Sequence, residues 1–133
     1  MIYVTESAEQ TMNVAFEFGK TLQAGDVVLL KGDMGAGKTV FAKGVAKALG
    51  IDPDEVLSPT YAYMNDYDGK LYHYDCYRLS CGEDALKLGL TDYFYENGVC
   101  LIEWSENIKE VLPPDCKTVV IENIGDGKRR ITL

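Results

Sequence analysis

The chain has 133 residues, of which 47% are hydrophobic and 26% are charged, so it can bury one core and is too apolar for wholesale disorder. Its 13 basic and 21 acidic residues give a net charge of −8, and such a field argues against strong direct binding of nucleic acid. The first residues lack the pattern of a signal peptide, and the apolar runs are too short to span a bilayer. We therefore expect a single domain over residues 1–133 that works in the cytoplasm without binding a membrane.

The first half of the chain predicts strands and helices in alternation. Residues 2–4 form a candidate strand, and apolar residues at helical spacing behind a capping-box pair predict a helix over about residues 8–22. Residues 27–30 are apolar on both faces, which is typical of a buried strand. A second helix is expected over residues 38–49, and Gly50 is a plausible residue to end it.

The second half of the chain predicts shorter helices and two hairpins. Asp68-Gly69 is a favoured tight-turn pair, so the segments on either side of it are expected to pair as strands. The expected elements are strands over residues 60–67, 70–79, 99–102, 117–122 and 129–133, one or two short helices over 82–97, and a short helix near 105–111. Buried strands separated by helices, together with hairpins, indicate an α/β domain with a mixed sheet.

The four cysteines do not form a metal-binding pattern. No two of Cys76, Cys81, Cys100 and Cys116 have C-x-x-C spacing, and His73 is the only histidine. A zinc site of the usual spacing is therefore disfavoured. Two of the cysteines, Cys76 and Cys100, lie in apolar runs, where a reduced and buried thiol is the expected state.

A glycine-rich loop follows the first buried strand. Residues 32–39 read Gly-Asp-Met-Gly-Ala-Gly-Lys-Thr, which fits G-x-x-x-x-G-K-[ST] at every fixed position. In such a loop the glycines let several backbone N–H groups converge on one anion, and the following helix adds the partial positive charge of its amino terminus. Lys38 is expected to reach the outer phosphates and Thr39 to bind a Mg²⁺ ion. The expected nucleotide-binding residues of the loop are Asp33, Met34, Gly35, Ala36, Gly37, Lys38 and Thr39.

Two acidic residues are candidates for the carboxylate that a Mg²⁺-nucleotide site needs near its cation. Glu103 follows a fully apolar strand, so it would project from the carboxyl end of that strand. Strand alternation around Asp75 places His73, Asp75 and Tyr77 on one face. The alternatives are a salt bridge from Asp75 to Arg78, a solvated position for either carboxylate, and a packed or hydrogen-bonded role for His73.

The loop after the second predicted helix carries a candidate hydroxyl group. Residues 58–61 read Ser-Pro-Thr-Tyr, and in phosphoryl-transfer proteins this region can hold a hydroxyl that senses the γ-phosphate. Thr60 is the candidate, and a plain turn explains the same residues equally well.

Taken together, four motifs resemble the TsaE (YjeE) family, the ATPase component of the bacterial machinery that makes threonylcarbamoyladenosine in tRNA. The resemblance covers about residues 7–106. The motifs are the 32–39 loop, Ser58-Pro59-Thr60-Tyr61, His73-Tyr74-Asp75-Cys76-Tyr77-Arg78-Leu79, and Leu101-Ile102-Glu103-Trp104 with Glu106. One departure is Val40, where many members of the family have a second threonine after the lysine.

The resemblance implies both a fold and an activity. The expected fold is a three-layer, P-loop NTPase-like α/β fold with a mixed central sheet and helices on both sides. The expected cofactors are ATP and Mg²⁺, with slow hydrolysis by the isolated protein, and the expected partners are the TsaD and TsaB proteins. The implied product is the threonylcarbamoyl group on adenosine 37 of tRNAs that read codons beginning with adenine.

The resemblance also assigns roles to particular residues. It implies metal contacts by Thr39 and Glu103, an important acidic role for Asp75, and nucleotide contacts by Glu106 and a basic residue near Arg130. The expected catalytic set is Lys38, Asp75, Glu103 and Thr60.

Two other functions fit the same phosphate loop. One is a small-molecule kinase, although the short chain leaves little room for an acceptor pocket and a lid. The other is a scaffold that binds a nucleotide without hydrolysing it.

Overall fold

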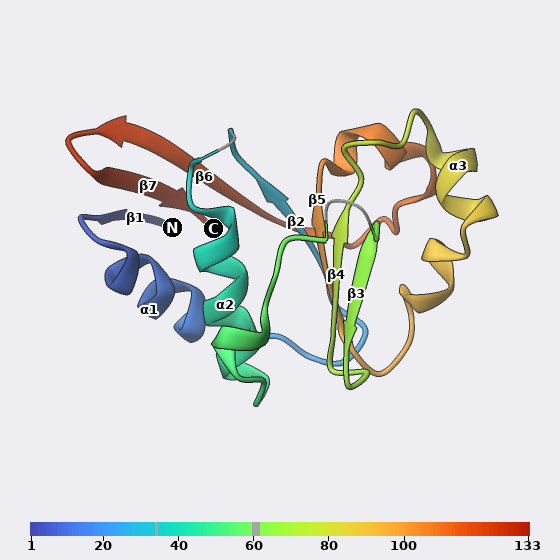
Figure 1. Ribbon diagram of the computed structural model, residues 1–133, viewed down its shortest axis with the longest axis horizontal. Helices are drawn as coiled ribbons and strands as arrows, with labels where there is room; N and C mark the ends of the chain where they lie inside the picture. Colours follow the sequence, from blue (N-terminus) through green and yellow to red (C-terminus); the bar gives the residue numbers. More distant parts are fainter. Residues whose placement is uncertain (34, 60–61) are drawn as a thin grey trace. The chain divides into compact units, whose positions relative to one another are not determined.

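The computed structural model describes residues 1–33, 35–59 and 62–133, and the chain divides into two compact units (Figure 1). The first unit comprises Met1–Leu22, Lys31–Leu57 and Thr118–Leu133, and the second comprises Gln23–Leu30 and Ser58–Lys117. Each unit is described separately.

The first unit combines a helix pair with an antiparallel set of strands. Strand β1 (Ile2–Thr5) pairs with β7 (Lys128–Thr132), which pairs in turn with β6 (Lys117–Gly125). Helix α1 (Ala8–Gly19) packs on helix α2 (Lys38–Ala48), and a short 3-10 turn, η1 (Pro53–Glu55), follows α2.

Helix α1 begins at the Ser7 cap that the sequence predicts, and Gln10 bonds to the residue before the cap instead of to Ser7 itself. The Ser7 hydroxyl accepts a hydrogen bond from the Gln10 backbone N–H at 3.1 Å, and the Gln10 side chain accepts one from the Glu6 N–H at 2.7 Å. The helix ends at Gly19, three residues earlier than expected, because the chain closes a tighter turn in which the Thr21 N–H bonds to the Phe18 carbonyl.

The second unit contains the parallel part of the fold. Strands β2 (Val27–Lys31) and β4 (Leu71–Asp75) both pair in parallel with β5 (Val99–Glu103), which lies between them, and β3 (Met64–Tyr67) pairs antiparallel to β4. Every residue of β4 and β5 is buried, as expected for strands in a parallel sheet. The remaining elements are α3 (Gly82–Lys87) and the 3-10 segments η2 (Leu90–Tyr93) and η3 (Ser105–Val111).

The structure confirms the predicted hairpin and corrects the outer end of each of its strands. Asp68 and Gly69 have φ angles of 55° and 67°, as the tight turn between β3 and β4 requires. The expected strand over 60–67 is wrong at its start, because β3 begins at Met64. The expected strand over 70–79 is wrong at its end, because β4 stops at Asp75. There the Asp75 side chain accepts a hydrogen bond from the Tyr77 N–H at 3.0 Å and turns the chain, so Tyr77 lies outside the strand and is exposed.

The cysteines have the state expected from their apolar surroundings. All four are free thiols, and Cys76 and Cys100 are buried in the core of the second unit. Among the described residues, no helix has both the length and the apolar character needed to cross a membrane.

Candidate functional site

The glycine-rich loop directly follows β2 and leads into α2. Gly35 and Gly37 have φ angles of 82° and 108°, which other residues rarely adopt. Gly32 lies so close to the chain that a Cβ atom there would approach the Ile121 carbonyl oxygen to 2.6 Å, whereas a Cβ on Gly35 would meet nothing within 4 Å. The loop is therefore packed on one side at Gly32 and open at Gly35.

The start of α2 is suited to bind an anion. Gly37 is the residue that caps the helix, and it offers no side-chain acceptor to the first N–H groups. These groups and the helix dipole favour a negatively charged ligand. Lys38, which is half-buried, and Thr39, which is exposed, occupy the first turn. Met34 lies outside the described residues.

An arginine on β7 holds the backbone of this loop. The Arg129 Nε donates a hydrogen bond to the Ala36 carbonyl at 2.9 Å, and one of its terminal nitrogens donates to the Gly35 carbonyl at 3.3 Å. The neighbouring Arg130 instead makes two hydrogen bonds, at 3.1 and 3.2 Å, to the carboxylate of Glu122 on β6. Arg129 is therefore the arginine that contacts the loop. The sequence did not predict this contact.

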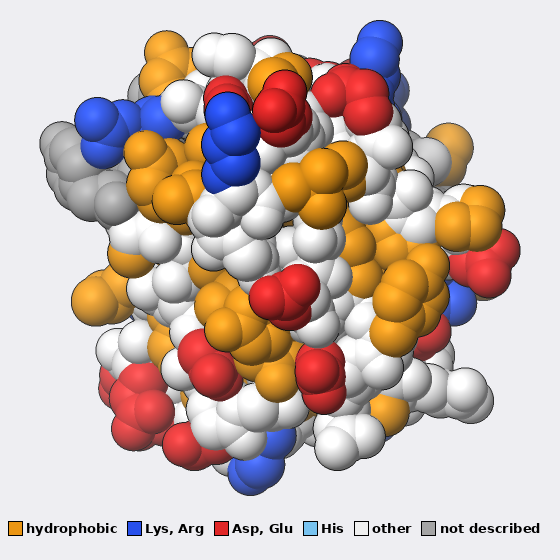
Figure 2. All heavy atoms as spheres, turned by 90° about the vertical axis from the view of Figure 1, so that its right-hand side faces the viewer, with side chains coloured by type: hydrophobic (Ala, Val, Ile, Leu, Met, Phe, Trp, Pro, Cys, Tyr) orange, Lys and Arg blue, Asp and Glu red, His pale blue; other side chains and the backbone are white. Residues whose placement is uncertain are grey.

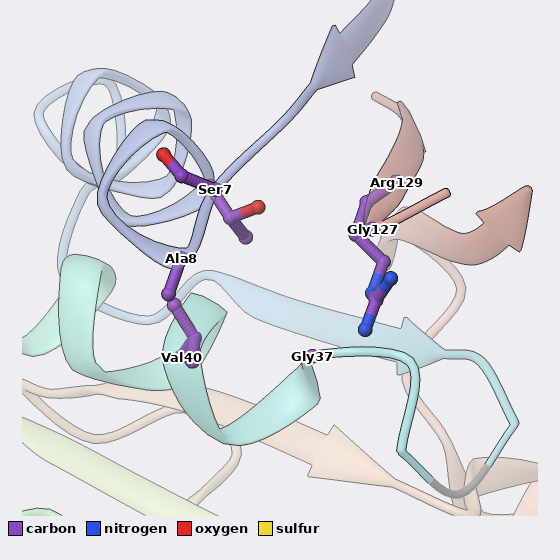
Figure 3. Close-up of a pocket in the computed structure, with 7 residues that line it drawn as sticks. Ser7, Ala8, Gly37, Val40, Gly127 and Arg129 are labelled. Carbon is purple, nitrogen blue, oxygen red and sulfur yellow. The ribbon is translucent and has the colours of Figure 1, made fainter. Parts of the chain in front are cut away.

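A small pocket of about 90 Å³ opens beside the loop in the first unit (Figure 3). Gly37 and Val40 contribute from the start of α2, Ser7 and Ala8 come from the start of α1, and the Arg129 side chain points toward the loop from β7. Thr11 and Gly127 complete its lining. The pocket therefore adjoins the end of the loop that passes into α2.

The second unit brings two acidic candidates together at the carboxyl ends of its parallel strands. Glu103 is the register partner of Asp75 on β4 and of Leu30 on β2. Register partners on neighbouring strands project to the same face of a sheet, so the two carboxylates are neighbours there. Both residues are buried, with exposures of 7% for Asp75 and 6% for Glu103. The glycine-rich loop begins two residues after Leu30.

Each of these carboxylates has a defined partner. The Nε2 atom of His73 lies 2.6 Å from Oε2 of Glu103, and the His73 side chain is fully buried. Asp75 accepts the hydrogen bond from the Tyr77 N–H, and the Cys76 N–H donates to the Glu103 carbonyl at 3.0 Å. These bonds hold the ends of β4 and β5 together.

The remaining candidate residues come from other parts of the chain. Glu106 is exposed in the first turn of η3, and Thr60 lies outside the described residues. Lys38 and Thr39 belong to the first unit, whereas Asp75, Glu103 and Glu106 belong to the second. In the part of the chain that the structure describes, no cluster of three or more His, Cys, Asp or Glu side chains is arranged to hold a metal ion by itself.

Comparison with known proteins identifies the family. The model of the family described as Threonylcarbamoyl adenosine biosynthesis protein TsaE matches residues 5–131. This chain belongs to the TsaE family. The TsaE-like motifs of the loop and of the strand ends thus lie within a match that covers nearly the whole chain.

Individual TsaE proteins are similar over most of their length. A protein of Bacillus subtilis is 44% identical over 97% of this chain and 82% of its own, and one of Treponema pallidum is 41% identical over 98% and 97%. Both are named tRNA threonylcarbamoyladenosine biosynthesis protein TsaE. A crystal structure of YdiB from Bacillus subtilis matches with a TM-score of 0.81 and 37% identity, over 98% of this chain and 82% of that one. This likeness confirms the predicted α/β fold.

Proposed function

We propose that this chain is a Mg²⁺-dependent ATP hydrolase that acts on a TsaD–TsaB complex during formation of the threonylcarbamoyl group on adenosine 37 of tRNA. One observation carries the proposal. A loop that fits G-x-x-x-x-G-K-[ST] stands between a strand of a parallel sheet and a helix amino terminus, with positive φ at two glycines. The family membership and the names of the relatives support the tRNA-modification part.

The residues of the loop suit a triphosphate. The open side of Gly35 and the start of α2, where no side chain accepts from the first N–H groups, offer backbone N–H groups, and Lys38 adds a positive charge in the same turn. We assign the phosphate tail to Asp33, Gly35, Ala36, Gly37, Lys38 and Thr39, together with Met34. The Thr39 hydroxyl is assigned to the Mg²⁺ ion.

The carboxylates of the second unit suit the cation. Asp75 and Glu103 are buried register partners at the ends of neighbouring strands, so their side chains project to the same face. Oxygen ligands are the ones that Mg²⁺ prefers. When bound, the ion would neutralise charge on the phosphates as it develops. Glu103 is assigned as a metal contact and Asp75 as the second acidic residue of the reaction.

Three further assignments rest on the family resemblance alone. Thr60 is proposed to sense the γ-phosphate, and Glu106 and Arg130 to contact the nucleotide. The partners TsaD and TsaB and the work done on them are proposed on the same ground. The net charge of −8 fits a subunit whose partners, and not itself, hold the RNA.

The test is phosphate release from ATP with and without a TsaD–TsaB complex, for the wild type and the K38A and E103Q variants. We expect partner-stimulated hydrolysis to fall by a factor of about 10² to 10³ in both variants, which is typical of losing one preorganised electrostatic contact. K43A, a change further along α2, is the control and should keep wild-type turnover. Unchanged turnover in E103Q would overturn the metal assignment.

The same assay separates the alternative functions. A phosphorylated metabolite that accumulates in place of free phosphate would show a small-molecule kinase. ATP binding that promotes association with TsaD–TsaB but gives no phosphate release would show a scaffold that does not hydrolyse its nucleotide.

A further inference from the structure

His73 is a fully buried polar residue to which the mechanism proposed above gives no role. His73 lies on β4, two residues before Asp75 and on the same face of the strand. Its side chain has no solvent exposure, and its Nε2 atom lies 2.6 Å from Oε2 of Glu103, whose side chain is 8% exposed. The contact crosses from β4 to the end of β5, and it is shorter than most hydrogen bonds between nitrogen and oxygen.

The surroundings of the imidazole ring indicate where its hydrogen lies. A carboxylate accepts hydrogen bonds, so the ring must carry its hydrogen on Nε2 to bond to Glu103. The other nitrogen, Nδ1, is buried and has no hydrogen-bond partner among the residues that the structure describes. The geometry therefore places a hydrogen on Nε2, which is donated to Glu103.

Such a bond determines the direction of the Glu103 carboxylate. A glutamate side chain has three rotatable bonds and can point in several directions from a strand end. A donor held rigidly in the core selects one of these directions. Residues that hold a metal ligand in this way commonly change metal affinity by 10 to 100-fold when they are removed.

We propose that His73 is a positioning residue that orients Glu103 toward the cation through the Nε2–H···Oε2 hydrogen bond. This inference rests on the proposed function of Glu103 as a metal contact. His73 itself touches neither nucleotide nor metal in this proposal. A purely structural role, in which the pair only satisfies two buried polar groups, would leave cation affinity unchanged when the bond is removed.

The first test uses the unmodified protein. ¹⁵N NMR of the imidazole ring reports which nitrogen carries hydrogen, and His73 is the only histidine, so the signals need no assignment by mutation. We expect a hydrogen on Nε2, as the bond to Glu103 requires. A ring with its hydrogen on Nδ1 alone could not donate to Glu103 and would overturn the proposal.

The second test uses two isosteric amides. In H73Q the side-chain nitrogen takes the place of Nε2, whereas in H73N it takes the place of Nδ1 and cannot reach Glu103. We expect the Mg²⁺ concentration that half-saturates binding of a fluorescent ATP analogue to rise by about tenfold in H73N and by less than threefold in H73Q. Nucleotide binding without Mg²⁺ should be the same in both.

The outcomes separate this inference from the proposed function. E103Q should shift the Mg²⁺ requirement by at least as much as H73N, and no shift in E103Q would overturn the metal role of Glu103. A shift in E103Q together with a wild-type Mg²⁺ requirement in H73N would overturn only the role of His73. If H73N does not fold, the NMR result still tests the proposal, and H73A, which also removes the donor to Glu103, takes the place of H73N in the Mg²⁺ titration.

Discussion

Two adjacent arginines on β7 have different partners, and this difference can be tested. Arg129 donates to the Gly35 and Ala36 carbonyls, whereas Arg130 pairs with Glu122. We predict that R129A speeds amide hydrogen exchange in the 32–39 loop of the nucleotide-free protein. It should also weaken ATP binding by about tenfold, because a hydrogen bond from a charged donor contributes about 1.5 kcal/mol. The measurements are hydrogen exchange by mass spectrometry and a binding titration.

The R130A variant shows whether an arginine of β7 stabilises the loop or only contacts the nucleotide. R130A should leave loop exchange at the wild-type rate, even if it weakens nucleotide binding as the family resemblance implies. K128A, on the same strand, is the control for both measurements. Equal loop exchange in R129A and the wild type would show that the arginine does not stabilise the loop.

The buried thiols give a prediction about pH. Burial raises the pKa of Cys76 to about 12 and that of Cys100 to about 11, because the thiolate would lose its hydration. The unfolded chain releases these protons near pH 9, before the folded protein does, so the unfolded state binds fewer protons above that pH. The free energy of unfolding should therefore fall as the pH rises from about 9 to 11.

Urea unfolding at pH 8 and pH 10 measures this effect. C100A should show a smaller fall between the two pH values than the wild type, whatever its stability at pH 8. In the native protein at pH 8, iodoacetamide should modify the partly exposed Cys81 before it modifies Cys76 or Cys100. A fall of the same size in C100A would contradict the assignment of the effect to this thiol.

At the scale of elements, the two helices of the first unit meet at glycines. A Cβ on Gly44 of α2 would approach the Ala15 Cβ and the Met12 carbonyl oxygen of α1 to 2.5 Å each. Overpacking of this kind costs about 1–3 kcal/mol, whereas the better helix propensity of alanine returns about 1 kcal/mol. A backbone carbonyl cannot rotate away as a side chain can, so we predict that G44A destabilises the protein.

Urea denaturation checks this prediction, with K43A in the same helix as the control. The G44A midpoint should be lower than both the wild-type and the K43A midpoints, with an unchanged dependence on urea. A G44A midpoint at or above that of the wild type would show that the helices can separate without cost.

The local sequence pattern predicts the helices, strands and turns of this chain well, but it predicts the contacts between them poorly. The tight turn at Asp68-Gly69 and the glycine-rich loop were predictable because their backbone angles depend on glycines within them. The end of β4 could not be predicted, because it depends on the backbone N–H group to which the Asp75 side chain bonds. Two contacts could not be predicted because they join residues far apart in the sequence: Arg129 and Ala36 are 93 positions apart, and His73 and Glu103 are 30 positions apart. Such contacts depend on strand register and side-chain rotamers, and hydrophobic periodicity predicts neither.

At the scale of the whole molecule, the negative charge is unevenly distributed. The second unit has twelve acidic and five basic residues, a net charge of −7, whereas the first has nine acidic and eight basic residues, a net charge of −1. Figure 2 shows one face on which acidic side chains lie among hydrophobic ones. The unit that carries the glycine-rich loop is thus nearly neutral itself, and most of the negative charge of the molecule belongs to the second unit.

This distribution predicts how salt acts on the two kinds of binding. Charges on the second unit should steer a partner protein with a basic surface, so its association rate should fall several-fold between 50 and 500 mM NaCl as the Debye length shortens. Neutralising two exposed acids of the second unit in E83Q/D92N should slow association at low salt, whereas E9Q/E55Q in the first unit removes the same charge with a smaller effect. Stopped-flow mixing with the proposed partner complex, TsaD–TsaB, measures both rates. If the two double variants slow association equally, the prediction is wrong. The association rate would then depend on the net charge of the molecule and not on where the charges lie.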